Sequence, residues 1–375
     1  MISSVLPTVI GAGRRIRAAC ADDIPQIADL RSRVFSWRQK DSAEEREAAV
    51  SRVFFENPFL DPELPSLVCT NERGRIIGFL GVSARTFQWQ GSPVRVAVQT
   101  GFMVEPSSRG IPGVMLLRRV MGGPQALTLA DSPNPPGRKL IERLGGMLVP
   151  ADSLYWVRPL RPVRYAVGQV RSGPLLFTAR VLARPLATGV DALATRVAAS
   201  PFYLKRPDTR EGPLSAAEHA RGLAAMAQLC ALSPAYEESQ LQWLMDALHR
   251  GPRGRDFQHV LVRSSTGDVI GWYVRYANRH GVSEVVQIGA RKDRYGDVLD
   301  HLFYAAWRDG SVAVSGRAQP MFMGTLADKG CIFSRNGPPM MVYSRHADLL
   351  EDIRAGRAFM SRLDGEWLMI QLSLS

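Results

Sequence analysis

Two parts of the sequence, one in each half of the chain, repeat the same order of strand, turn and helix. The first pair is SLVCTNERGRIIGFLGV at 66–82 and HVLVRSSTGDVIGWYVR at 259–275, each with two apolar runs around a glycine-containing turn. The second pair is ALTLADSPNPPGRKLIERLGG at 126–146 and SVAVSGRAQPMFMGTLADKGC at 311–331. A matched order of elements over such long stretches is typical of a diverged internal duplication. The chain is therefore predicted to contain two copies of one fold.

Apolar periodicity predicts the elements of each copy. In the first copy, short apolar runs between turn residues predict strands at 14–20, 66–70, 76–89, 94–104, 126–131 and 154–160. Helical spacing predicts helices at 21–35, from Pro112 onward and at 135–146. We expect the strand at 154–160 to close the first copy, and we expect a strand at 338–344 in the second. Helices mixed with antiparallel hairpins are typical of the α+β class.

The duplication divides the chain into three regions. We expect an N-terminal domain at 14–160, a basic connector at 161–210 and a C-terminal domain at 211–375. Lys and Arg exceed Asp and Glu by 12, and residues 158–206 carry two thirds of that excess, with nine basic side chains against one acid. Such a segment could follow an anionic membrane surface or RNA, or pack as an ordinary linker whose arginines extend over apolar surface.

The sequence argues against several classes of protein. It contains no apolar run long enough to cross a bilayer, and its N-terminal positive charges follow the apolar stretch, unlike those of a secretory signal. We therefore expect a cytoplasmic protein, with peripheral association at the inner face of the membrane as the alternative that the basic connector leaves open. The four cysteines are scattered and form no C-x-x-C pair, so neither disulfides nor a metal site are predicted. The sequence does not indicate an oligomeric state.

Residues 104–113, VEPSSRGIPG, join a predicted strand to a predicted helix through a turn rich in Ser, Arg and Gly. The backbone N–H groups at a helix N-terminus, together with the positive end of the helix dipole, favour a bound anion such as phosphate. Pro112 has no N–H, so a cradle here has fewer donors than a glycine-rich one. The sequence therefore predicts an anion-binding turn in which Arg109 supplies the positive charge.

This order of elements, with such a loop after the fourth strand, resembles the GNAT acyltransferase family, and the doubled form resembles its tandem-domain members. The resemblance covers most of residues 14–160 and, more weakly, 211–375. It implies two tandem GNAT-like domains, each a mixed, mostly antiparallel sheet flanked by helices, and acetyl-CoA or another acyl-CoA as co-substrate. In that family the loop binds the coenzyme A pyrophosphate. The residues that the resemblance assigns to cofactor binding are Val104, Ser107, Ser108, Arg109, Gly110, Gly113 and Asn134.

A second motif follows the fifth strand of the first copy. The positions that match a register common in the family are Asn134, Gly137, Leu144 and Gly145. Ile141 stands where the family often has a tyrosine, and isoleucine cannot protonate a departing thiolate. The second copy also lacks the tyrosine, and its loop RKDRYGD at 291–297 has one glycine and two acids. The first copy is therefore the expected cofactor binder.

Acyl transfer from a thioester to an amine also needs a base that takes the amine proton. Glu105, beside the loop, and Asp131, at the end of the fifth strand, are the candidate catalytic bases, although a solvated or helix-capping carboxylate is the ordinary use of either residue. No histidine precedes His219, which excludes a histidine base from the N-terminal domain.

We therefore expect an acyltransferase that moves an acyl group, acetyl in the simplest case, from acyl-CoA to a small-molecule amine or amino-sugar acceptor. Asp364 and Glu366, which flank a glycine near the C-terminus, would form a tight turn or a pair of carboxylates able to hold that amine. A second hypothesis is a FemABX-like aminoacyl transferase that uses charged tRNA, with the basic connector as the tRNA track. A third, favoured by the missing tyrosines, is a catalytically inactive GNAT-like protein that binds or regulates a partner.

Overall fold

The computed structural model describes residues 8–10, 13–35, 42–151, 153–169, 189–191, 193, 197, 200, 202–250 and 256–365. The chain divides into two compact units, each built from separated segments. Unit 1 comprises Met1–Ser153, Cys230–Arg253 and Pro338–Ser375, and unit 2 comprises Leu154–Leu229 and Gly254–Gly337. The domain boundaries expected above follow the duplication along the chain, whereas these units follow contacts in space. Each unit is described by itself.

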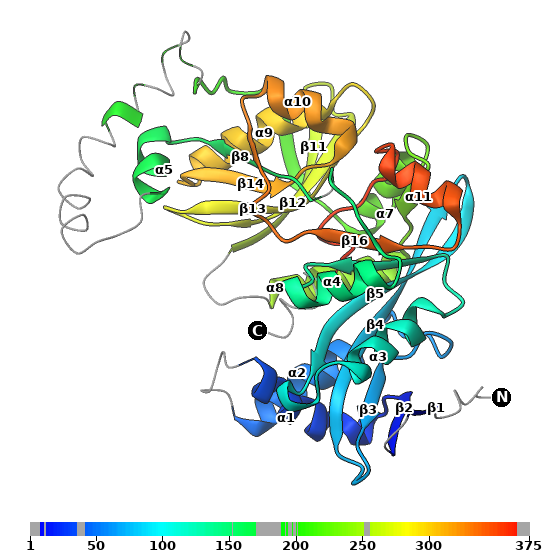
Figure 1. Ribbon diagram of the computed structural model, residues 1–375. Coiled ribbons are helices and arrows are strands. Elements are labelled where there is room, and N and C mark those ends of the chain that lie inside the picture. The colour runs from blue at the N-terminus through cyan, green and yellow to red at the C-terminus, as the bar shows by residue number, and fades with distance from the viewer. Residues whose placement is uncertain are drawn as a thin grey trace, which may run out of the picture. The chain divides into compact units, whose positions relative to one another are not determined.

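Unit 1 is built on a nine-stranded sheet, named sheet A here (Figure 1). Its strands are β1 (Thr8–Ile10), β2 (Arg14–Ala18), β3 (Leu67–Thr70), β4 (Ile76–Trp89), β5 (Ser92–Val104), β6 (Leu127–Asp131), β7 (Met147–Leu148), β10 (Leu232–Pro234) and β16 (Met340–Tyr343). The order is β1-β2-β3-β4-β5-β6-β16-β7, and β10 pairs with β4 outside that path. Only the β5–β6 pair is parallel among the described strands of this sheet.

The helices of unit 1 lie on both faces of sheet A. They are η1 (Ala21–Asp23), α1 (Ile24–Val34), α2 (Ala43–Phe54), η2 (Pro106–Ser108), α3 (Ile111–Met121), α4 (Pro135–Arg143), α8 (Glu238–His249) and α11 (Ala347–Arg354). A side chain at Gly78 of β4 would meet Leu116 of α3, and one at Gly81 would meet Phe54 of α2. Residues three apart in a strand face opposite sides, so α3 and α2 cover opposite faces of the sheet (Figure 1).

The core of unit 1 has an apolar cluster on each face of sheet A. The cluster on the α3 face includes Leu80, Val82, Leu116, Ile141 and Met341. The cluster on the opposite face includes Phe87, Val98, Leu129, Met340 and Val342. The side chains of β16 thus alternate between both clusters, and β16 is an inner strand because it pairs with β6 on one side and β7 on the other.

Unit 2 is built on a seven-stranded sheet, named sheet B here. Its strands are β8 (Tyr155–Pro159), β9 (Thr209–Pro213), β11 (Asp256–Ser264), β12 (Val269–Ala277), β13 (Val282–Ala290), β14 (Ala313–Arg317) and β15 (Ile332–Ser334). Its helices are α5 (Pro162–Gln169), α7 (Ala216–Met226), α9 (Tyr295–Arg308), η3 (Pro320–Phe322) and α10 (Met323–Asp328). The order is β15-β8-β14-β13-β12-β11-β9, and β13–β14 is its parallel pair.

The two sheets repeat one strand order, and their last strands are exchanged. Sheet A runs β2-β3-β4-β5-β6-β16-β7, and sheet B runs β9-β11-β12-β13-β14-β8-β15. β8 follows β7 in the chain but pairs with β14 and β15, while β16 follows β15 but pairs with β6 and β7. The prediction of two mixed, mostly antiparallel sheets flanked by helices is confirmed.

The expectation that the strand at 154–160 closes the first copy is wrong. This segment forms β8 and belongs to sheet B, and the strand expected at 338–344 supplies the missing position of sheet A as β16. The physical reason is that two copies of one fold offer equivalent strand positions. An apolar pattern fixes which side chains face the core, but it does not say which of two equivalent sheets a strand joins.

A chain that ends at Gly337 should lose order in sheet A while sheet B stays protected. Removing β16 strips β6 and β7 of their antiparallel partner and opens both apolar clusters of unit 1. We expect amide hydrogen exchange of residues 127–131 to accelerate by about 100-fold or more, while residues 269–277 change little. A chain that ends at Gly365 keeps β16 and serves as the control. Equal protection of residues 127–131 in both truncated chains would contradict the strand exchange.

Candidate functional site

The parallel strands β5 and β6 of unit 1 separate before either of them ends. They pair over Val96–Gln99 and Leu127–Ala130, and the described residues beyond are not paired with each other. β5 carries a bulge against β4, where Gly101 adopts a left-handed conformation with φ of 61°. The extra residue of a bulge bends its strand and raises the local twist. The bend leads the end of β5 away from β6 and toward the loop before α3.

The predicted anion-binding loop follows β5. Val104, the last residue of β5, pairs with Gly78 of β4, and the backbone then makes the short helix η2. The N–H of Ser108 donates to the Glu105 carbonyl at 2.8 Å. In the described part of the chain, no hydrogen-bond acceptor meets the N–H groups of Arg109, Gly110, Ile111 and Gly113. Four donors therefore remain at the N-terminus of α3, which agrees with the orphan N–H groups expected of a helix start.

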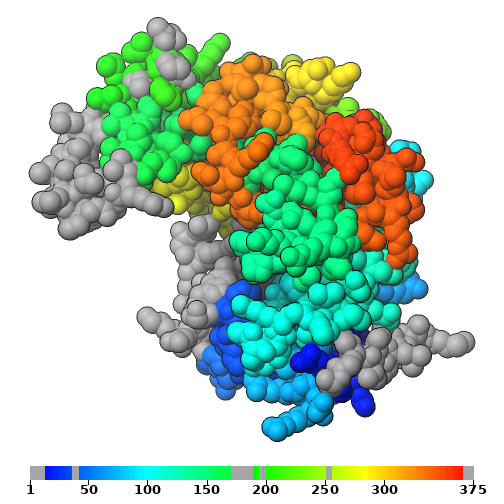
Figure 2. Space-filling model, viewed as in Figure 1, coloured from blue at the N-terminus to red at the C-terminus, as the bar shows by residue number. Residues whose placement is uncertain are grey.

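The side chains of this loop lie at the surface. Glycine is required at its two glycine positions for different physical reasons. Ser107, Arg109 and Gly110 are exposed, and the cyan residues around α3 lie on the visible face in Figure 2. Gly110 has a φ of 116°, a backbone conformation that residues other than glycine rarely adopt. Gly113 is buried, and a side chain there would lie 3.2 Å from the Phe102 ring. Gly113 therefore lets α3 begin directly against β5.

Glu105, a predicted base, is held by two arginines. Its Oε1 forms ion pairs with Arg33 of α1 and, at 3.0 Å, with Nη2 of Arg75. The Glu105 side chain is 17% exposed, so these pairs are partly shielded from water. The geometry thus ties α1 to the β3–β4 turn at the end of β5.

Asp131, the other predicted base, is the last residue of β6 and is fully buried. It lies on the same face of sheet A as Leu129, and its backbone faces Met340 of β16. Ser132 Oγ donates to Oδ1 at 3.4 Å. A side chain at Gly365 would collide with Oδ2, so the backbone near the C-terminus passes directly over this carboxylate. Glu366 lies outside the described residues.

The motif after β6 consists of the start and the stop signals of α4. Asn134 is the N-cap, and its Oδ1 accepts the N–H of Gly137 at 2.8 Å. Ile141 is buried in the cluster on the α3 face. At the other end Gly145 has φ of 92°, and the N–H of Gly146 donates to the Ile141 carbonyl. The role of Asn134 in cofactor binding stays a prediction, for which the side-chain Nδ2 group would be the donor.

A buried polar cluster of unit 1 was not identified from the sequence as a site. Arg85 of β4 stacks on Phe59, with the guanidinium carbon 3.4 Å from the ring centroid. Tyr236 donates from its hydroxyl to Asp364 Oδ1 at 2.7 Å. Burial is the main cause that raises the pKa of the Asp364 carboxyl and of the Tyr236 hydroxyl, and it lowers the pKa of Arg85. Asp364, expected in a tight turn, also accepts the N–H and Oγ of Ser361.

The equivalent loop of unit 2 is arranged differently. Arg294 is the N-cap of α9 and forms an ion pair with Asp297 at 2.7 Å. Tyr295 is buried and stacks on Phe322, with ring centroids 3.7 Å apart. At the end of β14, Arg317 occupies the place that Asp131 has at the end of β6. Among the described residues, no group of three or more His, Cys, Asp or Glu side chains could hold a metal ion.

Comparison with solved structures identifies the fold. The chain is similar to a probable N-acyltransferase from Enterococcus faecalis V583, at 11% identity over 88% of this chain and 72% of that one, with a TM-score of 0.55. It is similar to a GCN5-related N-acetyltransferase from Anabaena variabilis, at 11% identity, 88% and 72% coverage and a TM-score of 0.58. A GCN5-related N-acetyltransferase from Kribbella flavida matches at 14% identity, 88% and 71% coverage and a TM-score of 0.55.

These similarities show the fold. The chain has the tandem GNAT-like architecture that its sequence predicted, and the resemblance is confirmed at that level. No protein-family model matches the sequence, and no curated protein does. In the parts of the chain that the structure describes, no helix is both long enough and apolar enough to cross a lipid bilayer.

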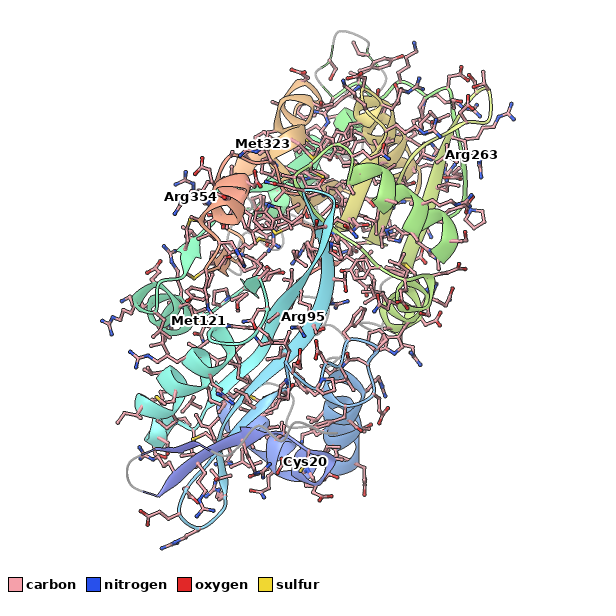
Figure 3. The ribbon with its side chains drawn as sticks, turned by 90° about the vertical axis from the view of Figure 1, so that its right-hand side faces the viewer. Cys20, Arg95, Met121, Arg263, Met323 and Arg354 are labelled. Carbon is pink, nitrogen blue, oxygen red and sulfur yellow. The ribbon has the colours of Figure 1, made fainter. Side chains whose placement is uncertain are left out.

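Replacing Glu105 with Gln should lower the stability modestly and in a salt-dependent way. The substitution removes two partly exposed ion pairs, so we expect a loss of about 1 kcal/mol in the free energy of unfolding, measured by urea denaturation. The loss should shrink in about 1 M NaCl, where the Debye length is roughly 3 Å. Glu63→Gln is the control, because its pair with Arg95, labelled on β5 in Figure 3, is more exposed. Equal losses of stability in both variants would show that the ion pairs of Glu105 with Arg33 and Arg75 stabilise the fold no more than an exposed ion pair does.

Proposed function

We propose that the protein is an acyl-CoA-dependent N-acyltransferase whose co-substrate binds unit 1. The proposal rests on two features that lie next to each other in unit 1, a pair of separating strands and a helix N-terminus. β5 parts from β6, and the N-terminus of α3 beyond β5 presents four N–H donors beside the exposed Arg109. The separated strands leave room for the backbone-like amides of the pantetheine arm to pair with β5, as an added strand would. The donors of the loop suit the pyrophosphate.

The loop residues differ in what they would supply. Arg109 would make a charge-assisted contact with a phosphate oxygen, and the hydroxyl groups of Ser107 and Ser108 would add donors. Gly110 would let the backbone approach the phosphate without a side chain in the way. Val104 and Gly113 would shape the site, because they bring β5 and α3 into contact. The general class of co-substrate is acyl-CoA, and acetyl-CoA is the proposed member.

The acceptor is proposed to be an amine or amino sugar, with Asp131 as the base. The amine nitrogen attacks the thioester carbonyl carbon, its proton passes to Asp131, and the carbon–sulfur bond breaks to release the thiolate of CoA. We prefer Asp131 to Glu105 because Oε1 of Glu105 is engaged by two arginines, whereas Asp131 lies where β6 leaves β5. Ile141 cannot protonate the thiolate, so the proton would come from water, which suffices for a leaving group of low basicity.

One observation favours a protein that binds acyl-CoA without turning it over. Ile141 is part of the apolar core, so no proton donor occupies the place of the family's tyrosine. Acyl-CoA binding that is unaffected by Asp131→Asn, with no transfer to any amine, would support this alternative. The tRNA-dependent alternative and the membrane or RNA contacts of residues 158–206 stay predictions, because much of that segment lies outside the described residues.

Arg109→Ala should weaken CoA binding. Loss of one charge-assisted contact to phosphate corresponds to about 1.5–3 kcal/mol, so calorimetry should show a dissociation constant higher by about 10- to 100-fold. Arg118→Ala is the matched control, since Arg118 is an exposed arginine in the last turn of the same helix. Affinity that is unchanged in Arg109→Ala, or lowered equally in both variants, would refute the loop as the pyrophosphate site.

Each chain should bind one acyl-CoA molecule, in unit 1. At the start of α9 the cation Arg294 is already paired with Asp297, and that carboxylate would repel a pyrophosphate. Titration with a non-hydrolysable acyl-CoA analogue should give a stoichiometry near one, and Arg294→Ala should leave the affinity unchanged. A stoichiometry near two, or loss of binding in Arg294→Ala, would show that unit 2 also holds the co-substrate.

A further inference from the structure

Arg85 is a fully buried arginine whose guanidinium group meets no hydrogen-bond acceptor in the part of the chain that the structure describes. It lies on β4, with 1% of its surface exposed, and its Nε, Nη1 and Nη2 meet no acceptor in the described residues. Ser83, two residues earlier on the same face of the strand, is also buried, and its Oγ has no partner there. A buried guanidinium without acceptors is costly, and a group of this kind calls for a physical reason.

The carboxylate that interacts electrostatically with Arg85 accepts no hydrogen bond from its guanidinium group. Asp364 is fully buried and acts on Arg85 electrostatically, but its two oxygens accept hydrogen bonds from Tyr236 and Ser361 instead. Arg85 therefore has a counter-charge nearby and still has its five N–H donors to give. Phe59 covers one face of the guanidinium plane at 3.4 Å. The donors point out along the edge of that plane, where a flat carboxylate can accept two of them at once.

Arg85 and Asp131 lie on one face of sheet A. Arg85 faces Val96 of β5, Val96 faces Leu127 of β6, and Asp131 is four residues further along β6. The strand spacing and rise place the two α-carbons roughly 16 Å apart, and both side chains project from the same face of the sheet. Two consecutive residues also connect Arg85 with Asp131. Asp364 interacts electrostatically with Arg85, and the backbone of Gly365 lies against the Asp131 carboxylate.

We propose that Arg85 binds a carboxylate of the acceptor, so that the acceptor is an amine with a carboxylate several bonds away. This inference rests on the proposed function, in which Asp131 takes the proton of the amine. Arg85 would hold the carboxylate through two parallel N–H donors, with Ser83 as a further donor. Phe59 would pack beside the intervening carbon chain. The segment 361–365 lies over this face, so it must move aside for the ligand to enter.

The test is calorimetric binding of small ligands without acyl-CoA, so that it does not depend on the co-substrate site. The probes, each at about 10 mM, are 6-aminohexanoate, hexanoate, hexylamine and inorganic phosphate. We expect 6-aminohexanoate and hexanoate to bind the native chain, and hexylamine to bind far more weakly. Arg85→Met should lower carboxylate affinity by at least about tenfold, as should Arg85→Lys, because lysine lacks the planar fork. Arg95→Met, on β5, is the control and should bind like the native chain.

Folding of the variants is checked by thermal melting. Replacing an unsatisfied buried charge by an apolar group of similar size is often neutral or stabilising, so Arg85→Met should melt no lower than the native chain. If it does not fold, Arg85→Lys carries the test. If the native chain binds neither 6-aminohexanoate nor hexanoate, the proposal is overturned, and Arg85 is a structural or water-bound arginine. Equal carboxylate binding in the variants, or Arg85-dependent binding of phosphate in preference to carboxylate, would overturn it as well. Loss of CoA binding in Arg109→Ala is separate, and it tests only the proposed function.

Discussion

The separation of β5 from β6 is the constraint on which the rest of the site depends. Parallel strands that stayed paired to their ends would bury their backbone groups in the sheet and would leave no room between them. The pairing ends at Gln99 and Ala130, β5 bulges against β4 at Gly101 before it reaches the loop that precedes α3, and Asp131 stands one residue beyond the last pair. The candidate anion-binding loop and the candidate base therefore lie on the two strands that part beside this glycine.

Strand exchange is the second constraint, because it makes the candidate site depend on residues far away in the sequence. β16 packs against β6, so the backbone opposite Asp131 comes from Met340, more than 200 residues later. The segment that follows α11 then supplies Asp364 and Gly365 to the same face. The first copy of the repeat therefore could not form this site alone. The sheet of each unit therefore draws its strands from both halves of the chain.

Much of the fold could be predicted from the sequence, and the limits of prediction have physical causes. The repeated hairpins, the loop at 104–113 and the helix at 135–146 were found, because turn glycines and apolar periodicity are local signals. α2 was missed even though Ser42 and Glu45 form a capping box, because its buried apolar residues all lie in its second half, from Ala49 to Phe54. The partners of 154–160 and 338–344 were missed because pairing is a long-range choice. Arg85 was missed because no pattern in the sequence reveals that an arginine within an apolar strand lacks an acceptor.

The two copies differ at the place where the candidate site lies in the first. The last residue of β6 is Asp131, and the last residue of β14 is Arg317, whose Nη2 donates to the Tyr155 hydroxyl at 3.1 Å. A carboxylate at this place can accept a proton from an amine, whereas a guanidinium remains charged at any pH that the protein experiences. The loops differ in the same sense, because Arg294 is paired with Asp297 and Arg109 has no such carboxylate beside it in the described chain. Both changes remove from the second copy the chemistry that we propose for the first, and they leave its sheet free to serve as structure.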